Sequence, residues 1–259
     1  MKCAISVIIP ALNEEKNLGP AIDNALKAFK DLKIDGEVIV VNDGSADRTK
    51  ETAEEFTAKR FPVRLLNHTS PRGIGASFWD GVDNSCGDIV VMLPGDNEND
   101  PWEILRYHKL LEHVDIVIPF LFNRQARSVF RNALSFVYRF IINTTFCVNF
   151  NYTNGTVMYR KSILKDMEHR SEGFFFQTDI LIRNVKKGYL FAEVPYRLGL
   201  RREGISKAVS FPSLIQVVKG YSWLVRDQYF RNGKKDKVAF SADSLTAIRR
   251  KEADEQGKS

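Results

Sequence analysis

Two acidic clusters follow apolar, strand-like runs within the first hundred residues. Residues 38–41 (Val-Ile-Val-Val) lead into Asn-Asp-Gly-Ser at 42–45, and residues 89–93 (Ile-Val-Val-Met-Leu) lead into Pro-Gly-Asp-Asn-Glu at 94–98. Such β-branched runs are typical of buried parallel strands, and open α/β sheets bind ligands at the carboxyl ends of their strands. Carboxylates at that edge suit a nucleobase, a ribose or a divalent cation that carries phosphates. The alternative is that each aspartate only caps the helix that follows it.

The elements that would position these clusters alternate between strand and helix over residues 4–118. We expect five strands there, at 5–9, 38–41, 63–66, 89–93 and 116–118. Apolar residues at helical spacing predict the intervening helices, which begin near Asn13, Asp47, Gly73 and Pro101, the last running to Glu112. This alternation favours an α/β fold in which a mostly parallel sheet carries helices on both faces.

The second half of the chain has a different pattern. Residues 132–150 are apolar and aromatic with one interior charge, Arg139, and residues 211–230 form an expected amphipathic helix. Aromatic segments beside basic residues suit the headgroup region of a membrane, but they also suit a core or a homodimer interface. We further expect a strand at 153–159, a helix at 177–187, a strand at 190–194 and a flexible, charged tail over 231–259.

The composition fits a globular protein with an anionic partner. The chain has 259 residues, of which 44% are hydrophobic and 27% charged, and its formal net charge is +6. That excess suits a nucleotide, a phospholipid surface or a nucleic acid. Three unpatterned cysteines favour free thiols in a reducing compartment, and the N-terminal residues do not read as a secretory signal. We therefore expect a cytoplasmic protein, with peripheral contact to the cytoplasmic face of a membrane as an option.

Five segments, in their order along the chain, resemble those of family 2 glycosyltransferases with the GT-A fold. The resemblance is strongest to the polyprenyl-phosphate, or dolichol-phosphate-type, transferases. The segments are 6–14 (Ser-Val-Ile-Ile-Pro-Ala-Leu-Asn-Glu), 40–45 (Val-Val-Asn-Asp-Gly-Ser), 72–75 (Arg-Gly-Ile-Gly), 93–98 (Leu-Pro-Gly-Asp-Asn-Glu) and 173–207. The GT-A fold implies a Rossmann-like sheet with an acceptor-side subregion. Residues 1–120 would then bind the nucleotide sugar, and residues 121–230 would form the acceptor side of the same domain.

The resemblance implies a nucleoside pocket at the strand ends. A carboxylate there accepts hydrogen bonds from a base N–H or a ribose hydroxyl, and small residues allow a close approach of the backbone. The implied nucleotide-binding residues are Pro10, Leu12, Glu14, Asp43, Arg72 and Gly73.

The Asp-x-Asp metal motif of the family is altered in this chain. Pro94 stands where the first aspartate would be, Asp96 is at the second, and Glu98 is at a neighbouring ligand position. Asp96 and Glu98 offer two hard oxygen ligands for Mg²⁺ or Mn²⁺, with diphosphate oxygens and waters completing the shell. The alternative is a plain polar turn.

The acceptor side is implied by three further matches. Residues 153–156 (Thr-Asn-Gly-Thr) resemble the family's Thr-Ser-Gly segment, 176–179 its aromatic-Gln-x-Glu segment, and 201–207 its Arg-x-x-Gly-x-Ser-Lys pattern. Guanidinium groups match phosphate oxygens, although a solvated basic loop would look the same. The implied acceptor-binding residues are Asn154, Gly155, Gln177 and Lys207, and the implied catalytic residues are Asp96, Asp179, Arg201 and Arg202.

Two other groups of basic residues stay unassigned. Arg124, Arg127 and Arg131 follow the fifth strand, where the family often binds phosphate, but they could equally lie on an exposed helix face. The four histidines lie outside the matched motifs, and we assign them no chemistry. They are His68, His108, His113 and His169.

The resemblance implies transfer of a sugar from a nucleotide-diphosphate donor, a UDP- or GDP-sugar, with inversion in a single displacement. A lipid phosphate acceptor is already anionic and needs no general base, whereas a saccharide hydroxyl needs one, for which Asp179 is the nearest candidate. Other readings are a non-catalytic nucleotide-sugar-binding relative and a nucleotidyltransferase, which would carry a glycine-rich basic loop where residues 10–14 stand here. We expect no nucleic-acid partner.

Overall fold

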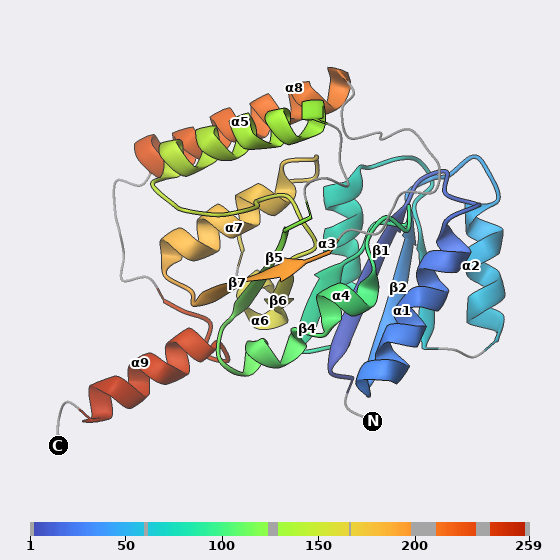
Figure 1. Ribbon diagram of the computed structural model, residues 1–259, viewed down its shortest axis with the longest axis horizontal. Helices are drawn as coiled ribbons and strands as arrows, with labels where there is room; N and C mark the ends of the chain where they lie inside the picture. Colours follow the sequence, from blue (N-terminus) through green and yellow to red (C-terminus); the bar gives the residue numbers. More distant parts are fainter. Residues whose placement is uncertain are drawn as a thin grey trace.

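In the computed structural model, residues 3–59, 62–123, 129–165, 167–197, 211–231 and 239–256 are described. Within these residues, seven strands form one sheet in the order β3-β2-β1-β4-β6-β5-β7 (Figure 1). Every neighbouring pair is parallel except the two that involve β6, which runs antiparallel to β4 and β5. The strands are β1 Ile5–Ala11, β2 Gly36–Asn42, β3 Val63–Asn67, β4 Ile89–Met92, β5 Ile116–Leu121, β6 Met158–Arg160 and β7 Phe191–Tyr196.

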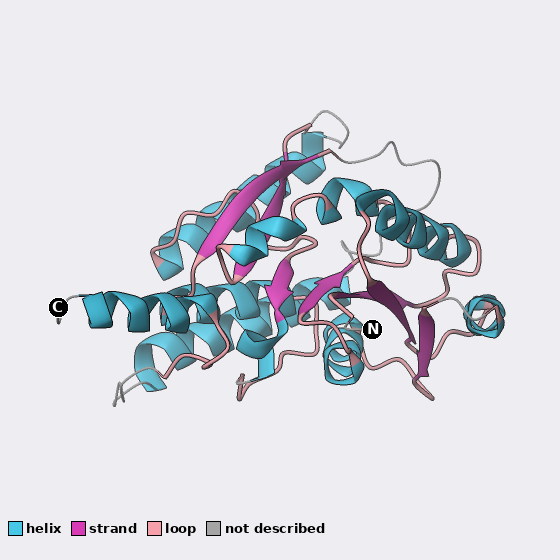
Figure 2. Ribbon diagram, turned by 90° about the horizontal axis from the view of Figure 1, so that it is seen from below, coloured by secondary structure: helices cyan, strands magenta, loops and turns pink. Residues whose placement is uncertain are grey.

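Helices pack on both faces of this sheet, as the alternating pattern predicts (Figure 2). They are α1 Leu18–Leu32, α2 Thr49–Ala58, α3 Ile74–Asn84, α4 Pro101–Leu105, α5 Val129–Phe146, α6 Lys161–Lys165, α7 Phe176–Lys187, α8 Phe211–Arg226 and α9 Leu245–Gln256. A 3-10 helix, η1, covers His108–Glu112, and α8 continues into a π-helical turn, η4, over Asp227–Arg231.

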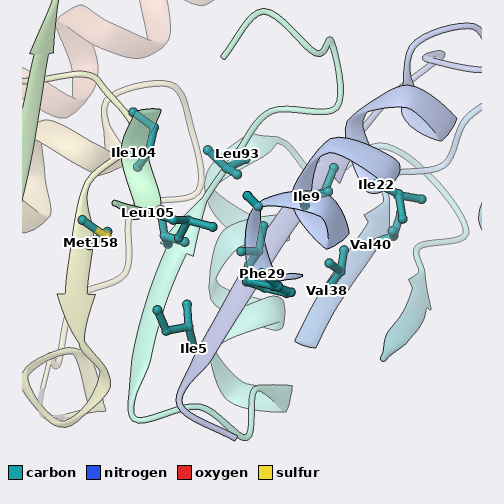
Figure 3. Close-up of a cluster of buried hydrophobic side chains, with 14 of the residues drawn as sticks. Ile5, Ile9, Ile22, Phe29, Val38, Val40, Leu93, Ile104, Leu105 and Met158 are labelled. Atoms are coloured by element: carbon teal, nitrogen blue, oxygen red, sulfur yellow. The ribbon is translucent and has the colours of Figure 1, made fainter. Parts of the chain in front are cut away.

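Two hydrophobic cores lie on the two faces because successive strand residues point to opposite sides. Ile5 and Ile9 of β1 pack against Ile22 and Phe29 of α1 in the first core (Figure 3). Ile8, between them in sequence, belongs to the second core, which includes residues of α3 and α7. The strands are therefore packed on both faces, and the loops at their carboxyl ends extend from a well-packed sheet.

Three elements differ in length from their sequence predictions. The first helix begins at Leu18 rather than near Asn13, because Asn13 has a left-handed backbone (φ +54°) and its loop bonds to the next one. The helix expected over 101–112 is split into α4 and η1. The strand expected over 153–159 is only Met158–Arg160, since the residues before it form a loop.

The end of the chain departs from the flexible tail expected over 231–259. Residues 239–256 are ordered on the domain: the backbone N–H groups of Leu245 and Thr246 donate to the carboxylate of Asp115, at 2.8 and 3.1 Å. The buried Asp115 thereby caps the N-terminus of α9. The ring of Phe240 also packs edge-on against Tyr189. The expectation of a flexible tail is therefore wrong for these residues.

Helices α5 and α8 lie side by side above α7 (Figure 1). Their C-terminal parts are joined by a hydrogen bond between Thr145 Oγ1 and the Tyr221 hydroxyl, at 2.8 Å, and by the edge-on contact of Phe146 with Tyr221. None of the helices described is long and apolar enough to cross a membrane.

Candidate active site

The loops after β1 and β2 are tied to each other at the carboxyl edge of the sheet. Asn13 accepts a hydrogen bond from the Ala46 N–H at 2.8 Å and donates its own N–H to Ser45 Oγ at 3.0 Å. The Glu14 N–H donates to Thr49 Oγ1 at 2.8 Å. These contacts place Leu12 and Glu14, two predicted nucleoside residues of the first loop, directly beside the loop that carries Asp43. Pro10, the third predicted residue, is buried near the end of β1, where it pairs with Val41 of β2.

Asp43 is buried at the end of β2 and holds the loop that follows β3. Its Oδ1 accepts the N–H of Arg72 at 2.8 Å and its Oδ2 accepts the N–H of Gly73 at 2.9 Å. Burial opposes ionisation, but the hydrogen bonds from Arg72, His68 and Gly73 outweigh it and lower the pKa of Asp43. Asp43, Arg72 and Gly73 therefore lie together, as predicted, around an ionised carboxylate.

His68 is a site residue that the sequence motifs did not indicate. Its Nδ1 lies 2.7 Å from Asp43 Oδ1, and its Nε2 lies 2.8 Å from Asp80 Oδ2. The guanidinium of Arg72 donates to the same oxygen of Asp80 at 2.6 Å. The sequence signal that could have found it is its position. His68 directly follows β3, and because β3 runs parallel to β2, it lies at the same edge of the sheet as Asp43.

The glycines of this loop permit contact with the second half of the chain. Gly73 has φ +103°, and a Cβ there would lie 2.9 Å from the carbonyl oxygen of Glu172. The Gly75 N–H donates to that same carbonyl at 2.9 Å. The segment that leads into α7 therefore packs against the predicted nucleotide loop. This close packing requires glycine at 73 and 75, because any larger residue would place a side chain between the two segments.

The loop after β4 carries the two predicted metal ligands. Gly95 N–H donates to the Pro10 carbonyl at 3.1 Å, which holds this loop against the end of β1. Asp96 and Glu98 are both half-buried, and the Glu98 N–H donates to Asp96 Oδ1 at 3.1 Å. Asn97 between them has φ +56°. Two adjacent carboxylates fit a hard cation such as Mg²⁺ or Mn²⁺, provided that diphosphate oxygens and waters supply the other ligands.

Asp43 and Asp96 lie on one edge of the molecule. Strand β1 separates β2 from β4, and all three are parallel. Neighbouring strands are about 4.8 Å apart, so the two loops start about 10 Å from each other. That separation suits a nucleotide whose base sits at one loop and whose diphosphate sits at the other.

On the predicted acceptor side, the loop with Asn154 and Gly155 is tied to the first turn of α7. The Thr178 hydroxyl donates to the Thr153 carbonyl at 3.1 Å. Asn154 is exposed, whereas Gln177 is 1% exposed and accepts a hydrogen bond from the Tyr159 hydroxyl at 2.8 Å. Gln177 therefore points into the second core through its amide oxygen.

Asp179 lies within the contact between α7 and α8. It is 1% exposed, and its Oδ1 accepts a hydrogen bond from Arg183 Nε at 2.9 Å. Burial raises the pKa of Asp179 to about 6, and the nearby Arg183 offsets this only in part. Arg183 also donates to Asp227 at 2.6 Å and stacks over Trp223. Asp179 is thus an ion-pair partner beneath α8.

The basic segment predicted to bind phosphates lies outside the described residues. This applies to Arg201, Arg202 and Lys207, and also to Arg124 and Arg127 of the unassigned arginine cluster.

Comparison with known proteins places this site in context. A family model described as glycosyl transferase family 2 matches residues 6–168. The chain is 31% identical over 226 residues to a dolichol-phosphate mannosyltransferase of Pyrococcus furiosus, which covers 78% of this chain and 58% of that protein. It is 25% identical over 207 residues to a dodecaprenyl-phosphate galacturonate synthase of Rhizobium johnstonii, and this match covers 78% of the chain and 61% of that protein. The chain spans about three fifths of the length of these relatives.

Solved structures share the fold. Glucosyl-3-phosphoglycerate synthase from Mycobacterium tuberculosis, crystallised with Mn²⁺, UDP and phosphoglyceric acid, superposes with a TM-score of 0.64 at 20% identity. The match covers 91% of this chain and 80% of that one.

Proposed function

The chain belongs to glycosyl transferase family 2, and we propose that it transfers a sugar from a nucleotide-diphosphate donor to a polyprenyl phosphate. The observation that carries the proposal is the common edge on which the Asp43 and Asp96 loops flank the end of β1. The acceptor class is supported by the two relatives, which are a dolichol-phosphate and a dodecaprenyl-phosphate enzyme.

The donor would bind across this edge. Its nucleoside would sit between the end of β1 with its loop, which carry Pro10, Leu12 and Glu14, and the Arg72–Gly73 loop that Asp43 holds. Asp96 and Glu98 would hold Mg²⁺ or Mn²⁺ against the diphosphate. A divalent cation bound there neutralises negative charge on the departing nucleoside diphosphate.

The acceptor phosphate would attack the anomeric carbon from the side of the second half, with inversion. A phosphate is anionic near neutral pH, so no side chain has to remove a proton from it. The structure of Asp179 supports this acceptor, because its carboxylate is buried and paired with Arg183 rather than open to a saccharide hydroxyl. Asn154, Gly155 and Gln177 line the start of α7 in this proposal, and Arg201, Arg202 and Lys207 enter it by resemblance alone.

The surface of α5 and α8 favours a lipid as the partner of the second half. Large apolar side chains are exposed along both helices, with Phe130 at 71%, Phe140 at 62% and Val218 at 56%. Patches of this kind mark interaction sites. Exposed Lys219 and Arg226 lie on the same helix as Val218, which suits an anionic headgroup layer. We therefore propose peripheral contact with a membrane surface, a homodimer interface being the alternative outcome.

The location that fits this proposal is the cytoplasmic face of a membrane. Cys3, Cys86 and Cys147 are all unpaired, which agrees with a reducing compartment.

Transfer is tested with labelled sugars. Purified protein is incubated with UDP- and GDP-linked radiolabelled sugars, Mn²⁺ and a short polyprenyl phosphate in detergent, and the label that partitions into organic solvent is counted. One donor of the panel should give a lipid-linked product that is lost on chelation of the metal. Label that instead enters saccharide acceptors would contradict the acceptor class. Donor binding without transfer to any acceptor would identify a non-catalytic relative.

A further inference from the structure

His68 joins two carboxylates from different elements. Its side chain is only 7% exposed, with Nδ1 2.7 Å from Asp43 Oδ1 and Nε2 2.8 Å from Asp80 Oδ2. Asp43 stands at the end of β2 and Asp80 on α3, so the imidazole spans the space between strand end and helix. The charged groups that face it are these two aspartates and Arg72, from the loop between β3 and α3.

With both carboxylates ionised, both contacts are hydrogen bonds only when both ring nitrogens carry a proton. A carboxylate offers acceptors alone, and a neutral imidazole has one N–H and one lone pair. With a neutral ring, a lone pair would face one of the two carboxylates. The imidazolium form turns the row Asp43–His68–Asp80 into an alternation of negative, positive and negative charge, and such charge-assisted hydrogen bonds are the stronger kind.

We propose that His68 is the positioning residue of the donor site, which keeps the Arg72–Gly73 loop in its nucleotide-binding form by joining Asp43 to Asp80. The chain of contacts is direct: His68 fixes the carboxylate of Asp43, and that carboxylate holds the N–H groups of Arg72 and Gly73. The inference rests on the proposed function, since it takes the donor to be a nucleotide sugar bound at this loop.

The shared oxygen of Asp80 gives His68 a second role in donor binding. Asp80 Oδ2 receives both the His68 ring and the Arg72 guanidinium, and the Arg72 side chain is 49% exposed. When a donor draws the guanidinium away, Asp80 keeps its contact with the His68 ring. Without His68, the full charge of Asp80 would hold Arg72 in place, and Asp43 would lose one of its three donors. Both effects weaken donor binding and leave the displacement step untouched.

The test compares nucleotide binding in five proteins by calorimetry, with UDP and GDP in the presence of Mn²⁺. The proteins are the wild type, His68→Gln, Asp80→Asn and the double variant, with His113→Gln, at an exposed position on another part of the fold, as the matched control. A hydrogen bond to a charged group is lost in His68→Gln, so we expect its dissociation constant to rise about 10-fold or more. Since His68 acts together with Asp80, the double variant should lose less than the product of the two single losses.

Steady-state kinetics separates positioning from general damage. In His68→Gln the donor KM should rise with the dissociation constant, while kcat and the acceptor KM stay within about twofold of the wild type. A fall in kcat with an unchanged donor KM would overturn the proposal, as would wild-type nucleotide affinity in His68→Gln. If the wild type itself binds neither nucleotide, the proposed function fails instead.

A measurement on the wild type tests the proposal even if the variants do not fold. Nitrogen-15 spectra of the histidine rings, assigned for His68 with the aid of His68→Gln or, if that variant does not fold, by through-bond transfer, report the protons on each ring nitrogen. Two protonated nitrogens in the nucleotide-free protein are the expected result. A ring with one protonated nitrogen would overturn the bridge.

Discussion

The two ends of the sheet present their side chains in opposite ways. At the β2-β1-β4 edge, polar groups are joined by hydrogen bonds: the buried Asp43 accepts three of them, and the more exposed loops after β1 and β2 are bonded to each other. On the β6-β5-β7 side, α5 exposes apolar rings such as Phe130 and Phe140 to solvent, and α8 exposes aliphatic side chains such as Val218. One end is a charged site held by hydrogen bonds, and the other is an exposed apolar surface.

This difference suggests that the two ends have different roles in the proposed reaction. A donor diphosphate needs fixed charges that cost no reorganisation when negative charge develops, and the Asp43 and Asp96 loops supply such an environment. The lipid-borne acceptor that we propose would need only to be brought to that edge, and an apolar face resting on a membrane would do this without a deep pocket. The contact of Glu172 with Gly73 and Gly75 links the two ends.

The largest effect should come from the loop that we propose to bind the metal. Asp96→Asn removes a negative oxygen ligand, so transfer should fall by about 100-fold or more, as for other losses of charge stabilisation in a reaction centre. Initial rates across a Mn²⁺ titration measure this. The matched control is Asp100→Asn at the end of the same loop: Asp100 caps α4 by accepting the Trp102 N–H, which asparagine also does. Equal losses in both variants would contradict a metal role for Asp96.

A smaller loss is expected at the junction between the two ends. Gly73→Ala puts a Cβ 2.9 Å from the Glu172 carbonyl on a backbone with φ +103°, which should cost about 1–3 kcal/mol of stability. Nucleotide affinity should fall about 10-fold as the loop shifts. Chemical denaturation and calorimetry measure the two effects.

The control for this glycine is Gly19→Ala in α1. A Cβ at Gly19 would meet only ordinary contacts, at 3.7 Å and beyond, and alanine favours a helix by up to about 1 kcal/mol. Loss of nucleotide binding in Gly19→Ala, or none in Gly73→Ala, would show that the junction does not govern the donor loop.

The apolar end should respond to polar substitution without loss of the fold. The double variant Phe130→Ser/Phe140→Ser removes two exposed rings, each able to contribute about 1.5–3 kcal/mol when buried, so binding to anionic vesicles should fall at least several-fold. Ile248→Ser on α9, also exposed, is the control outside this surface. Co-flotation and light scattering are the measurements. Unchanged flotation would contradict membrane contact, as would a dimer that only the double variant dissociates. The apolar surface would then be an interface with a second copy of the chain.

The smallest effect on transfer is expected at Asp179. Burial raises its pKa from 3.8 to about 6, so the folded protein retains a proton that the unfolded chain releases. The free energy of unfolding therefore falls as pH rises from about 4 to about 6, a contribution that Asp179→Asn removes. The stability of the variant relative to the wild type should increase over this window, by up to about 3 kcal/mol.

Transfer to polyprenyl phosphate should stay within about threefold in Asp179→Asn, because no base is needed for an anionic acceptor. Denaturation at several pH values and the transfer assay test both statements. A pH-independent difference in stability would contradict the raised pKa, and a loss of transfer of 100-fold would restore Asp179 as a base.

The donor end was largely predictable from the sequence because its signals are local. The β-branched runs before 42–45 and 94–98 set the strands, and parallel pairing then placed both acidic loops at one edge. His68 was missed because its partners, Asp43 and Asp80, are not near it in a motif. Its position after β3 was the only local sign.

The second half was less predictable because its structure depends on contacts distant in sequence. The antiparallel β6 inserts between β4 and β5, which no turn signal indicates. Helix α9 is fixed by Asp115, 131 residues away from Thr246, so composition alone suggested a flexible tail. Asp179 fits a family motif, yet Arg183 and Asp227 determine its environment.

The most direct test follows the backbone amides of Gly73 and Gly95 in a nitrogen-15-labelled protein during titration with UDP and GDP. Gly73 reports on the loop that Asp43 holds, and Gly95 on the loop that leads to Asp96. With Mg²⁺ present, both signals should shift together and saturate at one nucleotide concentration, and substitution of Mn²⁺ should broaden Gly95 more strongly. A nucleotide that perturbs only one loop, or neither, would contradict a shared donor site at this edge.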